Sequence, residues 1–93
     1  SAMGVILGGS GQGEAIIANK FPKIRAIVYC AANQDIIRLS REHNDANVLS
    51  LGARFLSEAD ALEAVRLWVK TPFSRDPRHV RRIRKITDIE RLI

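Results

Sequence analysis

The sequence predicts an α/β fold, in which short strands alternate with helices and form a parallel sheet. Three apolar segments have the length and composition of strands: residues 5–7, 24–29 and 48–51. Each is followed by a segment with helical periodicity, namely residues 15–20, 33–42 and 57–69. A fourth helical segment starts near Asp76 and covers residues 76–93. Strands that alternate with helices pair in parallel, and the helices cover the faces of the sheet. Three strands are few for such a sheet, so its exposed edge would need a partner strand or further sequence.

The first expected strand leads into a glycine-rich turn. Its three consecutive apolar residues, 5–7, are typical of a strand that is covered on both faces. Residues 8–14 follow with the sequence Gly-Gly-Ser-Gly-Gln-Gly-Glu, and four glycines in six positions let the backbone turn sharply and a ligand approach closely. The next helix would offer unpaired N–H groups to an anion. We expect Ser10 or Gly13 as its N-cap, and we expect its sheet-facing residues to be Ala15, Ile16 and Ala18.

The glycine-rich turn does not match the common nucleotide-binding loops. A P-loop has Lys and then Ser or Thr after its last glycine, whereas Gly13 is followed by Glu14 and Ala15. The dinucleotide pattern G-x-G-x-x-G also fails, because a match starting at Gly9 would place its third glycine at Glu14. These mismatches disfavour ATP, GTP and NAD. The turn taken alone is also compatible with a plain strand-to-helix connection that binds nothing.

The later helices are delimited by capping residues and prolines. Residues 21–23, Phe-Pro-Lys, should end the first helix, since proline cannot continue it. Asn33 is the expected cap of the second helix, and Ser57 with Asp60 resembles a capping box. The apolar residues of the second helix are Ile36, Ile37 and Leu39, and those of the third are Ala61, Leu62, Val65, Trp68 and Val69. After a break at Thr71-Pro72-Phe73, the last helix has one apolar face with Val80, Ile83, Ile86 or Thr87, Ile89 and Ile93.

The composition is that of one small domain with a basic excess. Its 93 residues include 15 Lys and Arg against 10 Asp and Glu, a net charge of +5 that is concentrated in residues 75–85. This excess suits an acidic partner, either nucleic acid or a phosphorylated small molecule. The single cysteine, Cys30, excludes an internal disulfide and fits a cytoplasmic protein. No apolar run reaches the roughly 18 residues of a membrane span, and the first residues lack the pattern of a signal peptide.

The glycine-rich turn is part of a wider pattern. It is accompanied by Ala-Asn-Lys at 18–20, Ser-Arg-Glu-His-Asn-Asp-Ala-Asn at 40–47 and Leu-Gly-Ala-Arg at 51–54. Together these segments closely resemble ribose-5-phosphate isomerase type B, in the sugar-phosphate isomerase family that also includes the galactose-6-phosphate isomerase subunits. The resemblance covers nearly the whole chain, and the block at 40–47 is its most specific part.

The resemblance implies a three-layer αβα fold with a parallel Rossmann-like sheet and a protruding C-terminal helix at 76–93. It also implies that this single domain, residues 1–93, is the C-terminal part of the family's domain. The first two strand–helix units of the family would then be absent. The first of them carries an Asp-x-Ala-Gly motif, whose aspartate helps to bind and open the sugar ring, so the chain alone is expected to have little or no activity.

The resemblance further implies an aldose–ketose isomerase that needs no cofactor and no metal. One subtype of the family has a cysteine base where Gly8 stands, and the other has glycine there and a glutamate base where Glu14 stands. Glu14 would move a proton between C1 and C2 of open-chain ribose 5-phosphate and ribulose 5-phosphate through an enediolate, and Ser10 would be a further catalytic residue. Backbone N–H groups can stabilise the enediolate oxygen. The substrate-binding residues of this loop would be Gly9, Gly11, Gln12 and Gly13. The alternative interpretation is that Glu14 has no catalytic role and is a surface glutamate that helps the helix to start.

Outside the loop, the resemblance assigns functions to a histidine, an asparagine and three arginines. His43 would be a catalytic residue that helps to open the sugar ring, although a lone histidine is more often structural. Asn44 would contact the substrate, and the phosphate would be bound by Arg54, Arg78 and Arg82. Arg78 and Arg82 are four residues apart and share one helix face. We expect a solvated basic face from Arg75, Arg81, Arg84 and Lys85, and structural roles for His79 and Cys30.

The resemblance implies a homodimer, or a larger homo-oligomer, with active sites shared between chains. One chain would supply the glycine-rich turn, and its partner would supply His43, Asn44 and the arginines. The helix at 76–93 would pack on the partner subunit. Two other functions remain open: a non-catalytic module that binds a phosphorylated ligand or serves in assembly, and a nucleic-acid binder that uses residues 75–85. The second lacks an aromatic platform, since the aromatic residues are scattered.

Overall fold

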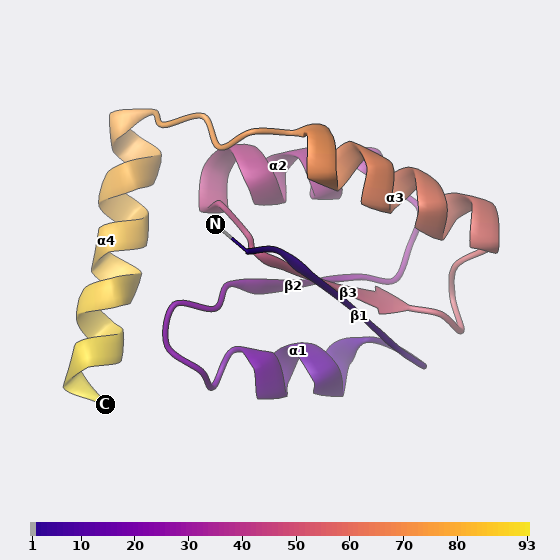
Figure 1. The fold of residues 1–93 in the computed structure, drawn as a ribbon, viewed down its shortest axis with the longest axis horizontal. Helices are drawn as coiled ribbons and strands as arrows, with labels where there is room; N and C mark the ends of the chain where they lie inside the picture. The colour runs from indigo at the N-terminus through magenta and orange to yellow at the C-terminus, as the bar shows by residue number, and fades with distance from the viewer. Residues whose placement is uncertain (1) are drawn as a thin grey trace.

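The computed structural model describes residues 2–93 and contains three strands and four helices (Figure 1). Strands and helices alternate along the chain until the last two helices. The elements are β1 (Gly4–Gly8), α1 (Gln12–Ala18), β2 (Ala26–Tyr29), α2 (Gln34–Asn44), β3 (Val48–Gly52), α3 (Glu58–Lys70) and α4 (Pro77–Leu92). This order confirms the predicted succession of elements.

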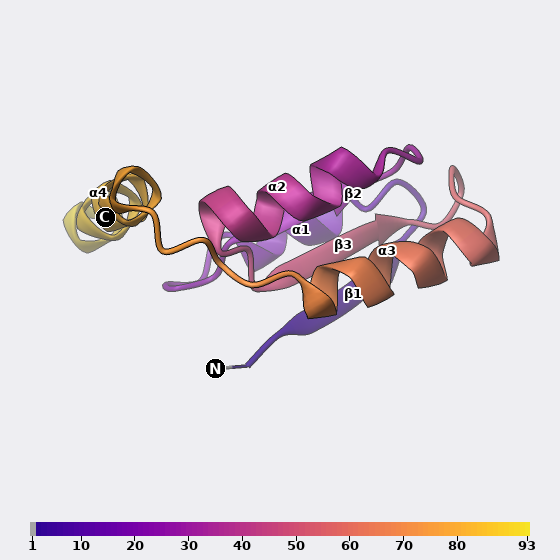
Figure 2. The ribbon, with the colours of Figure 1, turned by 90° about the horizontal axis from the view of Figure 1, so that it is seen from above.

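The three strands form one parallel sheet with β3 in the middle, in the order β1-β3-β2. Leu49 of β3 is level with Val5 on one side and with Ile27 on the other. Helix α1 covers one face of this sheet, and α2 and α3 cover the other (Figures 1 and 2). The sheet therefore lies between two helical layers, which confirms the predicted three-layer α/β fold.

The hydrophobic core lies between the sheet and the layer formed by α2 and α3. Trp68 and Ile37, from the two helices, and Leu49, from the central strand, are fully buried. The core is completed by Tyr29, Leu51 and Ala64. Because the side chains of Leu49 and Leu51 alternate with Ser50, the central strand presents its leucines to this core and its serine to α1.

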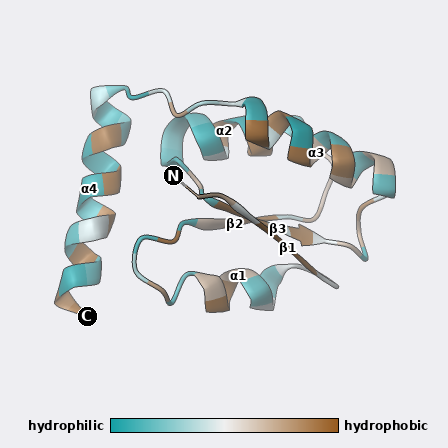
Figure 3. Ribbon diagram, viewed as in Figure 1, coloured by the Kyte–Doolittle hydropathy of each residue, from teal (hydrophilic) through white to brown (hydrophobic). Residues whose placement is uncertain are grey.

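Several apolar residues that were expected to be covered are exposed instead. Val5 and Leu7 of β1 are 44% and 67% exposed, because β1 is an edge strand and no described helix covers its outer half. Ile16 is 61% exposed, since α1 lies on the sheet with Ala15 buried and with Ile16 turned outward. The same outcome holds for Ile36, Leu39, Leu62 and Val69. On the last helix, Ile86, Ile89 and Ile93 are also exposed, and their packing on a partner subunit stays a prediction. Figure 3 shows apolar residues on the outer sides of helices as well as in the strands. Helical periodicity indicates apolar faces, but a sheet of three strands is too narrow to cover all of them.

The predicted helix caps are confirmed in two helices and corrected in one. The side chain of Asn33 accepts a hydrogen bond from the Asp35 N–H at 3.1 Å, and that of Ser57 accepts one from the Asp60 N–H at 3.0 Å. In α1 the N-cap residue is Gly11, which has no side chain to cap with, so neither Ser10 nor Gly13 holds that position. The helix also ends at Ala18, before the expected break at residues 21–23.

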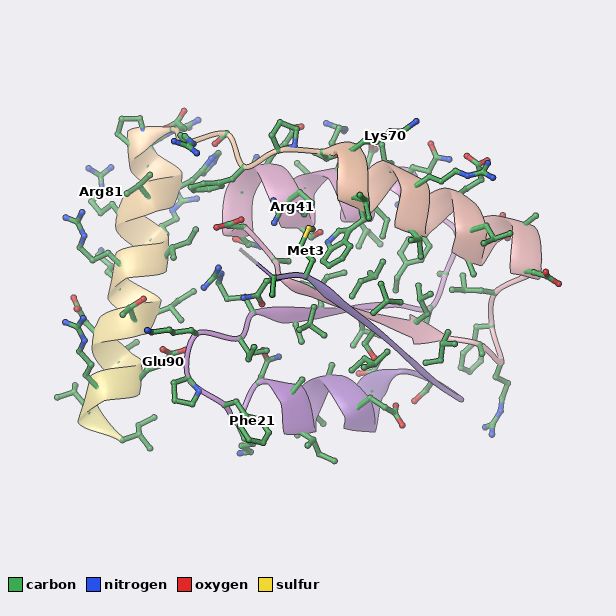
Figure 4. The ribbon with its side chains drawn as sticks, viewed as in Figure 1. Met3, Phe21, Arg41, Lys70, Arg81 and Glu90 are labelled. Carbon is green, nitrogen blue, oxygen red and sulfur yellow. The ribbon has the colours of Figure 1, made fainter. Side chains whose placement is uncertain are left out.

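Helix α4 lies at one side of the fold, and its axis runs across the direction of the other helices (Figures 1 and 2). Both carboxylate oxygens of Glu90 accept the backbone N–H of Lys23 at 3.3 Å, which ties the end of α4 to the connection between α1 and β2. Figure 4 shows Glu90 on the inner side of α4 and Arg81 on its outer side. The packing of α4 on a partner subunit stays a prediction.

Replacement of Trp68 tests the position of the core. Trp68→Ala should lower the free energy of unfolding by about 3–5 kcal/mol, because it removes buried surface and leaves a cavity. Leu62→Ala, on the same helix but 52% exposed, should change it by less than about 1 kcal/mol. Urea denaturation followed by circular dichroism measures both. Fluorescence is unsuitable, because Trp68 is the only tryptophan and the first variant lacks it. Equal losses would contradict this core.

Candidate active site

The glycine-rich turn lies at the carboxyl ends of β1 and β3. The pairing between the two strands extends into the segments that follow them. The Ala53 N–H donates to the Gly8 oxygen at 2.8 Å, and the Arg54 N–H donates to the Gly9 oxygen at 2.9 Å. Ligands of parallel α/β sheets bind at this end of the strands. The structure therefore places the turn where the fold class expects a site.

Two glycines allow the turn to lie directly against the central strand. Gly11 has a φ of 78°, a conformation that side chains rarely adopt, and its carbonyl oxygen accepts the Ser50 hydroxyl at 2.6 Å. A Cβ atom on Gly52 would lie 2.5 Å from the Ser10 carbonyl oxygen. The loop and the end of β3 thus approach each other at backbone distance, which any side chain at Gly52 would prevent.

The carboxyl group of Glu14 lies over Gly8. Glu14 is half-buried in the first turn of α1, and a Cβ atom placed on Gly8 would overlap with its carboxyl atoms. A side chain at position 8 and the observed orientation of Glu14 therefore exclude each other. This geometry agrees with the expected pairing of a glycine at position 8 with a glutamate at position 14, while the role of Glu14 as a base stays a prediction.

Arg54 lies beside the same loop. Its Nη2 atom is 3.1 Å from the position that a Cβ atom of Gly9 would take, and its side chain is exposed. The sequence analysis grouped Arg54 with His43, as a contribution of the partner chain, whereas the structure places Arg54 beside the loop of its own chain. Which chain supplies the arginine to a shared site stays a prediction. The loop therefore has a carboxylate, a guanidinium group and the N-terminus of α1 beside it.

His43 and Asn44 lie at the other end of the sheet. They form the end of α2, which leads into the amino end of β3, whereas Glu14 follows the carboxyl end of β1. One chain therefore does not bring Glu14 and His43 together. This separation agrees with the predicted site shared between two chains, which stays a prediction.

Much of the block at residues 40–47 holds the fold together. The Arg41 guanidinium group donates to the Thr71 and Ala46 carbonyl oxygens, at 3.0 and 2.7 Å, and pairs with Asp45 at 2.8 Å.

Asn47 and Ser40 add further bonds from the same block. The side chain of Asn47 accepts the Arg25 N–H at 2.7 Å and donates to the Lys23 oxygen at 2.8 Å. Ser40 is buried and donates to the Ile37 oxygen at 2.7 Å. These residues hold the end of α2, and thereby His43 and Asn44, in place.

His79 contacts a predicted site residue, which the sequence did not indicate. Its ring stacks on that of His43, with the ring centroids 4.1 Å apart and the planes inclined by 28°. His79 is buried, as expected for a structural residue, and its Nδ1 atom is 2.7 Å from the Ser74 Oγ atom. A pair of histidines 36 positions apart has no periodicity that could reveal such a contact.

Arg78 and Arg82 are exposed on the first turns of α4. Arg78 donates to the two carboxylate oxygens of Asp76, at 3.2 and 3.3 Å. Its hydrogen bonds lower the pKa of Asp76 below the ordinary value, and the same pair raises the pKa of Arg78. Arg82 makes no ion pair within residues 2–93. Arg78 is thus oriented by its own chain, while Arg82 points into solvent.

Neither a metal site nor a membrane-spanning helix is found among the described residues. Among residues 2–93, no three His, Cys, Asp or Glu side chains gather closely enough to hold a metal ion. None of the helices described here has the length and apolar character to cross a membrane.

The family model for Ribose/Galactose Isomerase matches residues 1–86. The chain belongs to the ribose/galactose isomerase family. It is 43% identical over 90 residues to ribose-5-phosphate isomerase B of Mycolicibacterium paratuberculosis, with 97% of this chain and 55% of the relative covered. It is 40% identical over 87 residues to ribose-5-phosphate isomerase B of Escherichia coli, with 94% and 56% covered. This member of the family spans about half the length of these relatives.

Solved structures from the family share the fold. A type B ribose 5-phosphate isomerase from Trypanosoma cruzi matches with a TM-score of 0.94 and 40% identity, over 100% of this chain and 61% of that chain. Ribose-5-phosphate isomerase B from Clostridium thermocellum matches with a TM-score of 0.89 and 45% identity, over 96% and 58%. The predicted family and fold class are therefore confirmed.

Alanine substitutions at Gly52 and Gly8 separate a backbone constraint from a side-chain one. At Gly52 the new methyl group would meet the Ser10 backbone, so the loop must shift, at a cost of about 1–3 kcal/mol of stability. At Gly8 it would meet only the Glu14 carboxyl group, which can rotate away, so stability should change by less than about 0.5 kcal/mol. Urea denaturation compares the two variants. Greater destabilisation by Gly8→Ala would refute this geometry.

Proposed function

We propose that this chain provides the proton-transfer half of a site that interconverts ribose 5-phosphate and ribulose 5-phosphate. The relatives are named ribose-5-phosphate isomerase B, and this supports the reaction. The observation that carries the assignment is the carboxyl group of Glu14 over Gly8, at the end of the sheet where ligands of α/β proteins bind. Because the chain covers 55% of the first relative, full activity requires more than this chain contains.

In the proposed reaction, Glu14 moves a proton between two neighbouring carbon atoms. Its carboxylate takes the proton from C2 of the open-chain aldose, which leaves an enediolate. It returns this proton to C1, while the proton of the C2 hydroxyl group passes to the C1 oxygen, and the ketose is formed. The enediolate oxygen then needs donors that are already in place. The first N–H groups of α1 have no partner within the helix, and the Gln12 N–H is directed to the Ser10 Oγ atom at 3.3 Å. The N–H groups of Gly13 and Glu14 therefore remain for the substrate.

The phosphate group and the sugar ring would be handled from both ends of the site. Arg54 lies beside the loop of its own chain, whereas Arg78 and Arg82 lie on α4, whose His79 stacks on His43. In a dimer that places the loop of one chain against α4 of the other, the three guanidinium groups would surround the phosphate group. His43 and Asn44 of the second chain would then reach the sugar.

A non-catalytic role in phosphate-ligand binding or assembly is the second candidate, because the chain covers only about half of its relatives. Isothermal titration with ribose 5-phosphate and measurement of the oligomeric mass address it on this chain directly. Nucleic-acid binding is less well supported, since Trp68 and Tyr29 are buried in the core and offer no stacking surface. Absence of binding to RNA and DNA at low salt would exclude it.

Glu14→Gln should abolish proton transfer with little effect on the fold. The amide keeps the size of the side chain but cannot accept the proton, so turnover should fall by about 100- to 10,000-fold. The measurement is conversion of ribulose 5-phosphate by this chain joined to the segment of the Mycolicibacterium relative that it does not match. Glu58→Gln is the matched control, because Glu58 is also a glutamate in the first turn of a helix, and no role in proton transfer is assigned to it.

The two failures of this experiment have different meanings. If the joined protein with Glu14 intact has no turnover, the proposed isomerase function is wrong. If the Glu14→Gln protein keeps the turnover of the Glu58→Gln control, the reaction stands and the assignment of the base is wrong.

A further inference from the structure

His79 is part of a small closed network at the start of α4. The Ser74 N–H donates to the Glu42 carbonyl oxygen at 3.1 Å, so the segment before α4 is tied to the residue that precedes His43. The Ser74 Oγ atom accepts the Asp76 N–H at 3.1 Å and lies 2.7 Å from the His79 Nδ1 atom. His79 in turn stacks on His43. The network therefore starts and ends at the last turn of α2.

We propose that His79 is a positioning residue for His43, which it holds by stacking in the orientation needed to open the sugar ring. The inference rests on the proposed function, because it assigns His79 a role through His43. His79 itself is 5% exposed, so it is covered by protein and unsuited to contact a substrate. His43 is half-buried and therefore remains accessible.

The stack restricts a side chain that has little else to hold it. His43 lies in the last turn of α2, and no hydrogen bond to its ring joins it to any other residue among 2–93. A flat ring pressed against it at 4.1 Å limits rotation about the side-chain bonds and leaves both ring nitrogens free at the edge. The imidazole is thus oriented without losing either atom that could transfer a proton.

Ser74 holds one edge of the supporting ring. Its Oγ atom accepts the Asp76 N–H and has a second lone pair and a hydroxyl hydrogen, so it can pair with the His79 Nδ1 atom in either tautomer of the ring. The supporting ring is therefore held by a hydrogen bond at one edge and by the His43 ring on its face.

Ring opening and proton transfer between carbons are separable steps. When ribose 5-phosphate opens, the bond between C1 and the ring oxygen breaks, the ring oxygen gains a proton and the C1 hydroxyl group loses one. An imidazole can carry either proton. Ribulose 5-phosphate cannot form a five-membered ring, because its C5 oxygen carries the phosphate, so its C1 proton exchanges without ring opening. Loss of His79 should therefore affect the two steps differently.

The kinetic experiment compares His79→Ala with the unchanged protein, in the joined form described above. We expect conversion of ribose 5-phosphate to slow by about tenfold or more, because a displaced catalytic group loses most of its effect. Exchange of the C1 protons of ribulose 5-phosphate in D₂O should stay within about twofold, since it depends on Glu14. Equal losses in both assays would refute the positioning role, whereas loss of exchange only in Glu14→Gln supports the proposed function independently.

A second experiment needs no activity and uses this chain alone. Nuclear magnetic resonance of the two histidine rings should show His43 protons shifted by the neighbouring ring. His79→Ala should remove the shift, and His79→Phe, which keeps a flat ring, should retain it. Ile83→Ala, one turn further along α4, is the control for general loosening of that helix. A His43 spectrum that is unchanged in His79→Ala would overturn the inference.

Discussion

The approach of the glycine-rich turn to the central strand is the constraint on which the site depends. Gly52 lets the Ser10 carbonyl group lie at the end of β3, and Ser50 holds the Gly11 carbonyl group from the neighbouring position on the same strand. These two contacts determine where α1 begins. The start of α1 in turn determines where Glu14 lies, because Glu14 is in the first turn of this helix. The position of Glu14 in the site thus follows from the contacts of the loop with Ser50 and Gly52.

The topology of a parallel sheet divides the functional residues of one chain between its two ends. Residues that follow strands gather at the carboxyl ends, and residues that end helices gather at the opposite side. Glu14 and Arg54 belong to the first group, and His43 belongs to the second. A single copy of this fold cannot join the two groups without changing the order of its elements. A second copy could join them, and the exposed apolar residues of α4, such as Ile86 and Ile89, would gain cover in such an assembly.

Local features could be predicted from the sequence, and packing between elements could not. The order of elements, the caps Asn33 and Ser57 and the glycine turn all depend on neighbouring residues, whose chemistry is visible in the sequence. The exposure of Ile16 and Leu7 depends on the width of the sheet, which no local pattern encodes. The placement of Arg54 was missed for a similar reason, because its grouping with other arginines rested on the family resemblance and not on the strand that it follows.

The block at residues 40–47 shows how one segment can serve both the fold and the site. Arg41 and Asn47 bind backbone groups of α3's end and of the connection before β2, so each has little freedom to vary without loss of stability. His43 lies between them and takes its backbone position from these bonds, while its ring stacks on His79 of α4. The start of α4 also carries Arg78, which pairs with Asp76. A movement of α4 would therefore displace the ring that stacks on His43 together with Arg78, so the two predicted functions of this end of the chain depend on the same contact between α2 and α4.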